Sequence, residues 1–234
     1  MRAPQRSVEP TLVPRRQRLG IDRRNRIFQT LALAAATLLL AATAHAQFGA
    51  PQTTRVLDSS ALHPPAGARV ALIEFEDLEC PDCARANPLL KEAAEKYHIP
   101  WVRHDFPLPM HNWSFNAAVN ARWFDTKSKM IGDDYRDYIF ANQPSIETPA
   151  QLTQITSKYA QAHGIPLPFA IDPQGKLSGL VKGDYALGQR IGIEHTPTIW
   201  VVTANSKGAP FVEVVDRSRL FQLIDQALAD TRGH

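Results

Sequence analysis

The stretch from residue 69 to residue 83 constrains the fold most, because an apolar run leads directly into a pair of cysteines. Residues 69–76 are mainly apolar, which predicts a buried β-strand. The motif Cys80-Pro-Asp-Cys83 follows, at the start of a helix predicted over 80–97. These are the chain's two cysteines, so any disulfide within the chain and any thiolate chemistry must use this pair.

The cysteine pair admits three interpretations. A structural zinc site needs four ligands, of which the pair supplies only half. An inert disulfide closing so short a loop would add little stability. Redox chemistry is favoured, because Cys80 at a helix start lies near unpaired N–H groups that lower a thiol pKa. Cys83, one turn further on, is then placed to resolve a mixed disulfide at Cys80, and Pro81 suits the first helical turn.

The first 46 residues have the features of an export signal. Residues 1–30 carry eight arginines, and residues 31–44 form a mainly apolar run. Ala44-His45-Ala46 then fits a cleavage site. Because the apolar run is short for a membrane span, we expect a cleaved signal over 1–46, with an uncleaved anchor as the alternative. Export to the periplasm would place the cysteines where disulfides persist.

The basic excess of the chain lies in this signal. The chain has 26 basic and 23 acidic residues, of which segment 1–46 holds 8 and 2. Residues 47–234 therefore hold 18 basic and 21 acidic residues, a net charge of −3. The charge thus gives no reason to expect a nucleic-acid partner.

The rest of the chain alternates strand and helix patterns. Residues 47–66 are rich in Pro, Thr and Ser and are expected to be a flexible linker. Residues 101–106 predict a second strand, and residues 112–191 a block of helices, with Asn112 and Thr148 as expected N-caps. Residues 198–203 and 211–215 predict paired strands, and residues 218–229 a closing amphipathic helix.

Three separated features together resemble the DsbA-like family of exported thiol–disulfide oxidoreductases. They are the strand leading into Cys80-Pro-Asp-Cys83, the segment Arg103-His-Asp-Phe-Pro107 with His111, and Gly192-Ile-Glu-His-Thr196-Pro197-Thr198. The resemblance covers about 66–231. It implies an α/β chain with a thioredoxin-like fold and an inserted α-helical subdomain at about 112–191, within a domain over 67–231.

The resemblance also implies roles for residues outside the cysteine motif. The Thr196–Pro197 bond is expected to be cis and to face the cysteines, leaving the Thr196 backbone free to pair with an extended substrate. A trans proline that only starts the strand is the alternative. Glu74 matches an acidic position beneath the cysteines, where burial would raise its pKa and let it relay the proton of Cys83. A solvent-facing Glu74 is the alternative.

Two further residues are expected to tune the cysteines. Asp82, with the acids at 76, 77 and 79, would oppose a thiolate at Cys80 and raise its pKa relative to a neutral residue there. The pair would then be less oxidising than a motif with histidine in place of Asp82. His195, if it lies near the cysteines, would favour the thiolate as a cation.

The function that the resemblance implies is dithiol–disulfide exchange, in the oxidising direction, on exported proteins with reduced cysteines. A substrate thiolate would attack the Cys80–Cys83 bond at Cys80, and a second substrate thiol would displace Cys80. The family also implies a membrane partner that reoxidises the pair, and we expect a monomer with no metal and no organic cofactor. A reductase or isomerase using the same residues, and a non-catalytic binding module with an inert disulfide, remain open.

Overall fold

The computed structural model describes residues 53–204 and 208–232. The predicted export signal over 1–46 lies outside these residues. Within the described ranges, no helix combines the length and the hydropathy that crossing a bilayer requires.

A four-stranded sheet in the order β2-β1-β3-β4 forms the centre of the fold. Its strands are β1 (Val70–Glu76), β2 (Trp101–Asp105), β3 (Thr198–Thr203) and β4 (Phe211–Glu213). β1 runs parallel to β2 and antiparallel to β3, and β4 pairs antiparallel with β3. Every residue of β1 is buried, as predicted for its apolar residues, and the two glutamates are buried with them.

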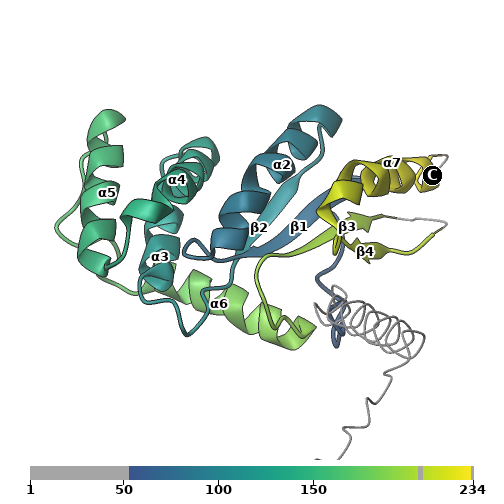
Figure 1. Ribbon diagram of the computed structural model, residues 1–234, viewed down its shortest axis with the longest axis horizontal. Coiled ribbons are helices and arrows are strands. Elements are labelled where there is room, and N and C mark those ends of the chain that lie inside the picture. Colours follow the sequence, from purple (N-terminus) through teal and green to yellow (C-terminus); the bar gives the residue numbers. More distant parts are fainter. Residues whose placement is uncertain (1–52, 205–207, 233–234) are drawn as a thin grey trace, which may run out of the picture. The chain divides into compact units, whose positions relative to one another are not determined.

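Helices cover both faces of the sheet (Figure 1). α2 (Pro81–Tyr97) and α7 (Leu220–Asp230) lie on one face, and α6 (Lys176–Ile191) lies on the other. The alternation of side chains along β1 supplies both cores. Leu72 packs with Leu90 and Ile224 on the first face, whereas Ile73 packs with Ile191 on the second. Even-numbered residues of β1 therefore face α2, which carries the cysteines.

The predicted helical insertion is present between β2 and β3. It comprises α3 (Ser114–Asp125), α4 (Lys129–Asn142), α5 (Pro149–Ala162) and α6, with a short 3₁₀ turn η1 (Gln143–Ser145). α3, α4 and α5 stand beside the sheet (Figure 1). Their shared core is aromatic and includes Trp113, Phe124, Tyr135 and Tyr159.

The structure confirms one of the two predicted caps. Thr148 Oγ1 accepts from the Gln151 N–H at 3.2 Å, ahead of Pro149 at the first helical position. The prediction that Asn112 caps α3 was wrong. The carboxylate of Glu79 instead accepts from the N–H groups at 113 and 114, at 2.7 and 2.9 Å, so the cap comes from the loop before the cysteines.

Buried ion pairs tie this insertion to the sheet. Arg103 of β2 donates to Glu76 of β1 over 2.7 Å, and Arg136 of α4 lies 3.2 Å from the same carboxylate. Arg122 of α3 pairs with Asp105 at the end of β2. These contacts leave few orientations open to α3 and α4, because a buried charge separated from its partner is costly.

The flexible linker expected over 47–66 is corrected for its described part, residues 53–66. The backbone N–H and the hydroxyl of Thr54 both donate to the carboxylate of Glu213, at 2.6 and 2.9 Å. The N–H of Leu57 donates to the Ile191 carbonyl, and Leu62 is buried. The segment packs on the domain because its few apolar side chains find sites there, which its Pro, Thr and Ser content did not reveal.

Candidate active site

The reactive pair lies where β1 passes into α2. Cys80 is the N-cap of α2, with extended backbone angles, and Pro81 is the first helical residue. The Sγ of Cys80 lies 3.3 Å from the carbonyl oxygen of Thr196. The Sγ of Cys83 accepts from the N–H of Asp77 at 3.4 Å. Both cysteines are free thiols here, so the structure represents the reduced form.

The surroundings shift the pKa values of the two thiols in opposite directions. Hydrogen bonding from Cys83 lowers the pKa of Cys80 to about 6, against burial, with further help from Thr196 and the N–H groups of Cys83 and Asp82. Burial raises the pKa of Cys83 well above its ordinary value, and the neighbouring Cys80 and Glu74 raise it further. At neutral pH the pair therefore carries a thiolate at Cys80 and a protonated thiol at Cys83.

Glu74 lies beneath the cysteines on the α2 face of β1. It is 1% exposed, so the structure has the inward-facing arrangement rather than the solvent-facing one. Its Oε2 accepts from Trp101 Nε1 at 3.0 Å, while its Oε1 has no hydrogen-bond partner among the described residues. Burial, followed by the charge of Glu76, raises the pKa of Glu74 to about 8.

The loop before β3 approaches the cysteines from the other side. The Thr196–Pro197 peptide bond is cis, as the resemblance implied. Thr198 Oγ1 donates to the His195 carbonyl at 2.7 Å, and this bond closes the loop. The backbone of Thr196 is thereby held beside the Cys80 sulfur.

The acidic neighbours of Cys80 are paired, which the expectation that Asp82 opposes the thiolate did not take into account. Arg217 Nη2 donates to Asp82 Oδ1 at 2.7 Å, and Arg217 Nη1 donates to the Asp82 carbonyl at 3.2 Å. Arg85 lies 3.1 Å from the same carboxylate. Although burial opposes it, these arginines hold the pKa of Asp82 below its usual value. The expectation that Asp82 raises the pKa of Cys80 relative to a neutral residue there stays a prediction, and the two arginines oppose that effect.

The other acids before the motif are also engaged. Glu76 pairs with two arginines, and Glu79 caps α3, as described above. Asp77 Oδ2 lies 2.7 Å from His111 Nδ1 and accepts from the Leu108 N–H, while its Oδ1 bonds Ser114. None of the three is left as an uncompensated charge facing the thiolate.

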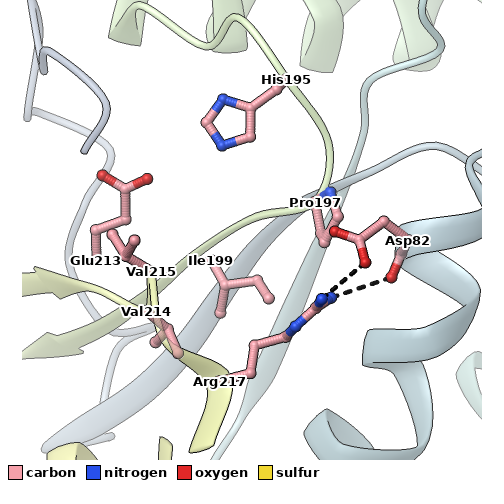
Figure 2. A pocket seen from close by; sticks show the side chains of 8 residues that line it. All are labelled: Asp82, His195, Pro197, Ile199, Glu213, Val214, Val215 and Arg217. Atoms are coloured by element: carbon pink, nitrogen blue, oxygen red, sulfur yellow. Dashed lines mark hydrogen bonds and ion pairs between the residues drawn. The ribbon is translucent and has the colours of Figure 1, made fainter. Parts of the chain in front are cut away.

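A cavity of about 300 Å³ opens beside the motif and the cis-proline (Figure 2). It is lined by Asp82, His195, Pro197, Ile199, Glu213, Val214, Val215 and Arg217. Arg217 points to Asp82, whereas the exposed His195 lies toward the other end of the cavity in this view. No hydrogen bond or ion pair of the described residues joins the His195 ring to either cysteine, so its predicted tuning of Cys80 has no contact to support it.

Three site residues were not predicted from the sequence. Arg217 lies in a polar turn with no pattern pointing to the cysteines. Gln143 donates from η1 to the carbonyls of Leu78 and Cys80, at 2.7 and 3.1 Å. Trp101 was placed in a strand, but no pattern marked its N–H as the partner of a buried carboxylate.

In the described part of the chain, no three His, Cys, Asp or Glu side chains are grouped as a metal ion would require.

Known proteins resemble this chain in both sequence profile and structure. A family model described as thioredoxin matches residues 65–215. The thiol-disulfide exchange protein alpha-DsbA2 from Wolbachia pipientis is similar with a TM-score of 0.55 and 18% identity, over 70% of this chain and 84% of that one. Oxidised BdbD from Bacillus subtilis is similar with a TM-score of 0.57 and 18% identity, over 76% and 98%.

ScsC from Proteus mirabilis, in a transitional conformation, is similar with a TM-score of 0.56 and 18% identity, over 88% of this chain and 93% of that one. No curated protein matches the sequence. At these identities the structural likeness establishes the fold, and it confirms the predicted thioredoxin-like architecture with a helical insertion.

Proposed function

The chain belongs to the thioredoxin family, and we propose that it is a DsbA-like thiol–disulfide oxidoreductase that oxidises exported proteins. The observation that carries the proposal is the opposite shift of two thiols in one motif. The pKa of Cys80 is lowered to about 6, while that of Cys83 is raised. An exchange enzyme needs this asymmetry, because one sulfur must leave easily and the other must stay shielded.

The reaction proceeds in two exchange steps. In the disulfide form, a substrate thiolate attacks Cys80 Sγ, and the electron pair of the broken Cys80–Cys83 bond passes to Cys83. A mixed disulfide between substrate and Cys80 results. A second substrate thiolate then attacks the substrate sulfur of that bond and releases Cys80 as a thiolate. The substrate loses two electrons and forms its disulfide, and the cysteine pair is left reduced.

Glu74 supplies the proton that the first step requires. Cys83 leaves as a thiolate in a buried position, where its pKa is high, so it must be protonated quickly. Glu74, with a pKa of about 8, holds a proton at neutral pH and lies on the strand face beneath α2. We assign it the role of general acid in this direction and general base in the reverse.

The low pKa of Cys80 supports the oxidising direction over reduction or isomerisation. A stabilised thiolate favours the reduced form of the enzyme, which makes its disulfide a stronger oxidant. The proposal further includes a periplasmic location, following the predicted signal over 1–46, a membrane partner that reoxidises the pair, and a monomeric state. Substrate is placed as an extended segment against the Thr196 backbone, which lies beside Cys80.

The test is the equilibrium reduction potential of the Cys80–Cys83 pair, measured by thiol trapping across glutathione buffers. A value above about −200 mV, together with oxidation of a reduced client peptide, supports the proposal. A value below about −270 mV would point to a reductase instead. Given the peptide in its disulfide form, Cys83→Ser should accumulate a mixed disulfide as Cys80 attacks the peptide disulfide and releases a peptide thiolate, whereas Cys80→Ser, the matched control, should not.

A further inference from the structure

The contact between Arg217 and Asp82 lies in the lining of the cavity beside the cysteines (Figure 2). Arg217 begins the 3₁₀ turn η2 (Arg217–Arg219), which follows β4, whereas Asp82 lies in the first turn of α2. The guanidinium bonds both the carboxylate and the backbone carbonyl of Asp82, at 2.7 and 3.2 Å. It therefore fixes the position of the residue between the two cysteines as well as its charge.

We propose that Arg217 is a positioning residue that neutralises Asp82, holds the Pro81–Asp82 turn, and thereby keeps the Cys80 thiolate stabilised. The inference rests on the proposed function and extends it by naming the group that sets the redox potential of the pair. Asp82 and the Cys80 thiolate compete for the positive end of the same helix. A freed carboxylate at this place would oppose the thiolate, and Arg217 prevents that.

The hydrogen bonds at Cys80 support this role. The N–H groups of Asp82 and Cys83 are among the groups that stabilise the thiolate. Arg217 bonds the carbonyl of Asp82, which belongs to the same peptide unit as the N–H of Cys83. Loss of the guanidinium would thus release a charge and loosen one of the peptide units that the thiolate depends on.

Arg85 is the natural comparison, because it also pairs with Asp82. Its side chain is 66% exposed, against 34% for Arg217, and it reaches only the carboxylate, from the next turn of the same helix. Exposed pairs at this spacing contribute little and are screened by salt. Arg217 is more enclosed and adds the backbone contact, so we expect it to dominate.

The remaining charges around the reactive sulfur leave Asp82 as the decisive carboxylate. Asp77 is held by His111 and Ser114, and Glu79 caps α3. Glu74 is protonated at neutral pH because burial raises its pKa. His195, on the cis-proline loop, lies toward the other end of the cavity (Figure 2).

The experiment compares R217Q, R217K and R85Q with the wild-type full chain. Two quantities are measured: the pKa of Cys80, from the pH dependence of its alkylation, and the equilibrium constant for reduction of the disulfide by glutathione. R217Q should raise the pKa of Cys80 by about one unit and, at about pH 8, where Cys80 is largely ionised in both proteins, lower that equilibrium constant about tenfold, or about 30 mV. R217K should recover most of the loss. R85Q should shift the pKa of Cys80 by less than about half a unit and change the equilibrium constant by less than about threefold.

A double variant separates action through Asp82 from direct action on the thiolate. In a D82N background the guanidinium has lost its ionic partner and keeps only its contact with the backbone carbonyl of residue 82. R217Q should then shift the pKa of Cys80 by less than about half a unit. An equal effect of R217Q with and without Asp82, or equal effects of R85Q and R217Q, would overturn the proposal.

The outcomes also distinguish the two proposals. Should the wild type fail to oxidise a reduced client peptide, the proposed function falls, while the alkylation data still test Arg217. Should the wild type oxidise the peptide and R217Q keep the wild-type pKa and equilibrium constant, only the role of Arg217 falls. R217K, which retains charge and length, serves in place of R217Q if the latter does not fold, with a smaller shift in the same direction expected.

Discussion

Trp101 Nε1 donates a hydrogen bond to Glu74 Oε2 over 3.0 Å, across the two parallel strands of the sheet. The other oxygen of the same carboxyl group is buried with no hydrogen-bond partner in the described part of the chain. The hydrogen bond fixes one oxygen, and in the proposed reaction the other oxygen would carry the proton. A buried polar atom without a partner is costly, and it persists here at the position where the proposed reaction needs a proton carrier.

Glu74→Gln should remove a pH dependence from the stability of the reduced protein. The pKa of Glu74 is raised from 4.5 to about 8, so between these values the folded chain holds a proton that the unfolded chain has lost. Wild-type stability therefore falls as pH rises through this window, by at most about 1.4 kcal/mol per pH unit from this group. The advantage of the variant over wild type should grow from about pH 5 to about pH 8.

Urea unfolding of both reduced proteins across this pH range measures the difference in their free energies of unfolding. The titration of Cys80 occurs in both proteins and largely cancels in this difference. Glu92→Gln, on an exposed position of α2, is the matched control for the loss of a glutamate charge. A constant gap between Glu74→Gln and wild type over the whole range would contradict a buried, titrating Glu74.

Trp101→Phe should shift the pH profile of the exchange reaction. Phenylalanine keeps an aromatic ring beneath Arg103, whose guanidinium carbon lies 4.3 Å from the Trp101 ring centre, but it cannot donate to Glu74. A hydrogen bond to the ionised carboxylate lowers its pKa, so the midpoint of the proton-transfer step should move up by about one unit. The rate of client oxidation as a function of pH gives this midpoint.

Trp113→Phe is a suitable control for that experiment. It also removes a buried indole hydrogen bond, from Trp113 Nε1 to the Ile146 carbonyl at 3.1 Å, in the same hydrophobic cluster as the cysteines but not to Glu74. It should lower stability without moving the midpoint. Equal shifts in both variants would mean that Trp101 acts through packing alone.

Gln143→Ala should loosen the loop that presents Cys80. The amide of Gln143 donates to two carbonyls of this loop, and alanine would leave both without that partner. We expect a loss of about 1–2 kcal/mol in the free energy of unfolding, measured in urea, and faster hydrogen exchange in the loop. Gln154→Ala, on an exposed face of α5, should stay within about 0.5 kcal/mol of wild type. If the loop of Gln143→Ala exchanged its amide hydrogens as slowly as the wild type, this role would be contradicted.

The parts of the fold that could be predicted from the sequence are those that depend on local sequence patterns. The run over 69–76 and the cysteine spacing each predict a feature within a few residues of themselves, whereas the cis Thr196–Pro197 bond was implied by the family resemblance. Family resemblance then ordered these features into the thioredoxin-like architecture. Thr148 could be predicted as a cap for the same reason, since its partner lies three residues away.

The pairings that sequence reasoning missed lie mostly between distant residues. Asp82 was judged by the acids that precede it, whereas its partners are Arg85, three residues on, and Arg217, 135 residues further on. Asn112 was chosen as a cap for its residue type, but Glu79 reaches the same helix end from another loop. Such contacts depend on how elements pack, so a charge near a motif says little about the field at the motif until its partner is known.

Gly188→Ala should destabilise the packing of α6 on the sheet. A Cβ at this glycine would lie 2.6 Å from Phe106 and 3.0 Å from Phe75, so both rings would have to move. These rings pack against each other at 6.1 Å between centres, and overpacking of such a core costs about 1–3 kcal/mol. That cost exceeds the gain of up to about 1 kcal/mol from replacing a helical glycine.

Gly183→Ala is the matched control on the same helix, because nothing lies within 4 Å of its added Cβ. It should gain about 0.5–1 kcal/mol through helix propensity alone. The two variants should therefore move the free energy of unfolding in opposite directions, as urea denaturation would show. Since α6 ends at Ile191, shortly before the cis-proline loop, the displaced helix in Gly188→Ala should also slow exchange at Cys80. Equal stabilisation by both alanines would mean that α6 is not seated on Phe75 and Phe106 as described.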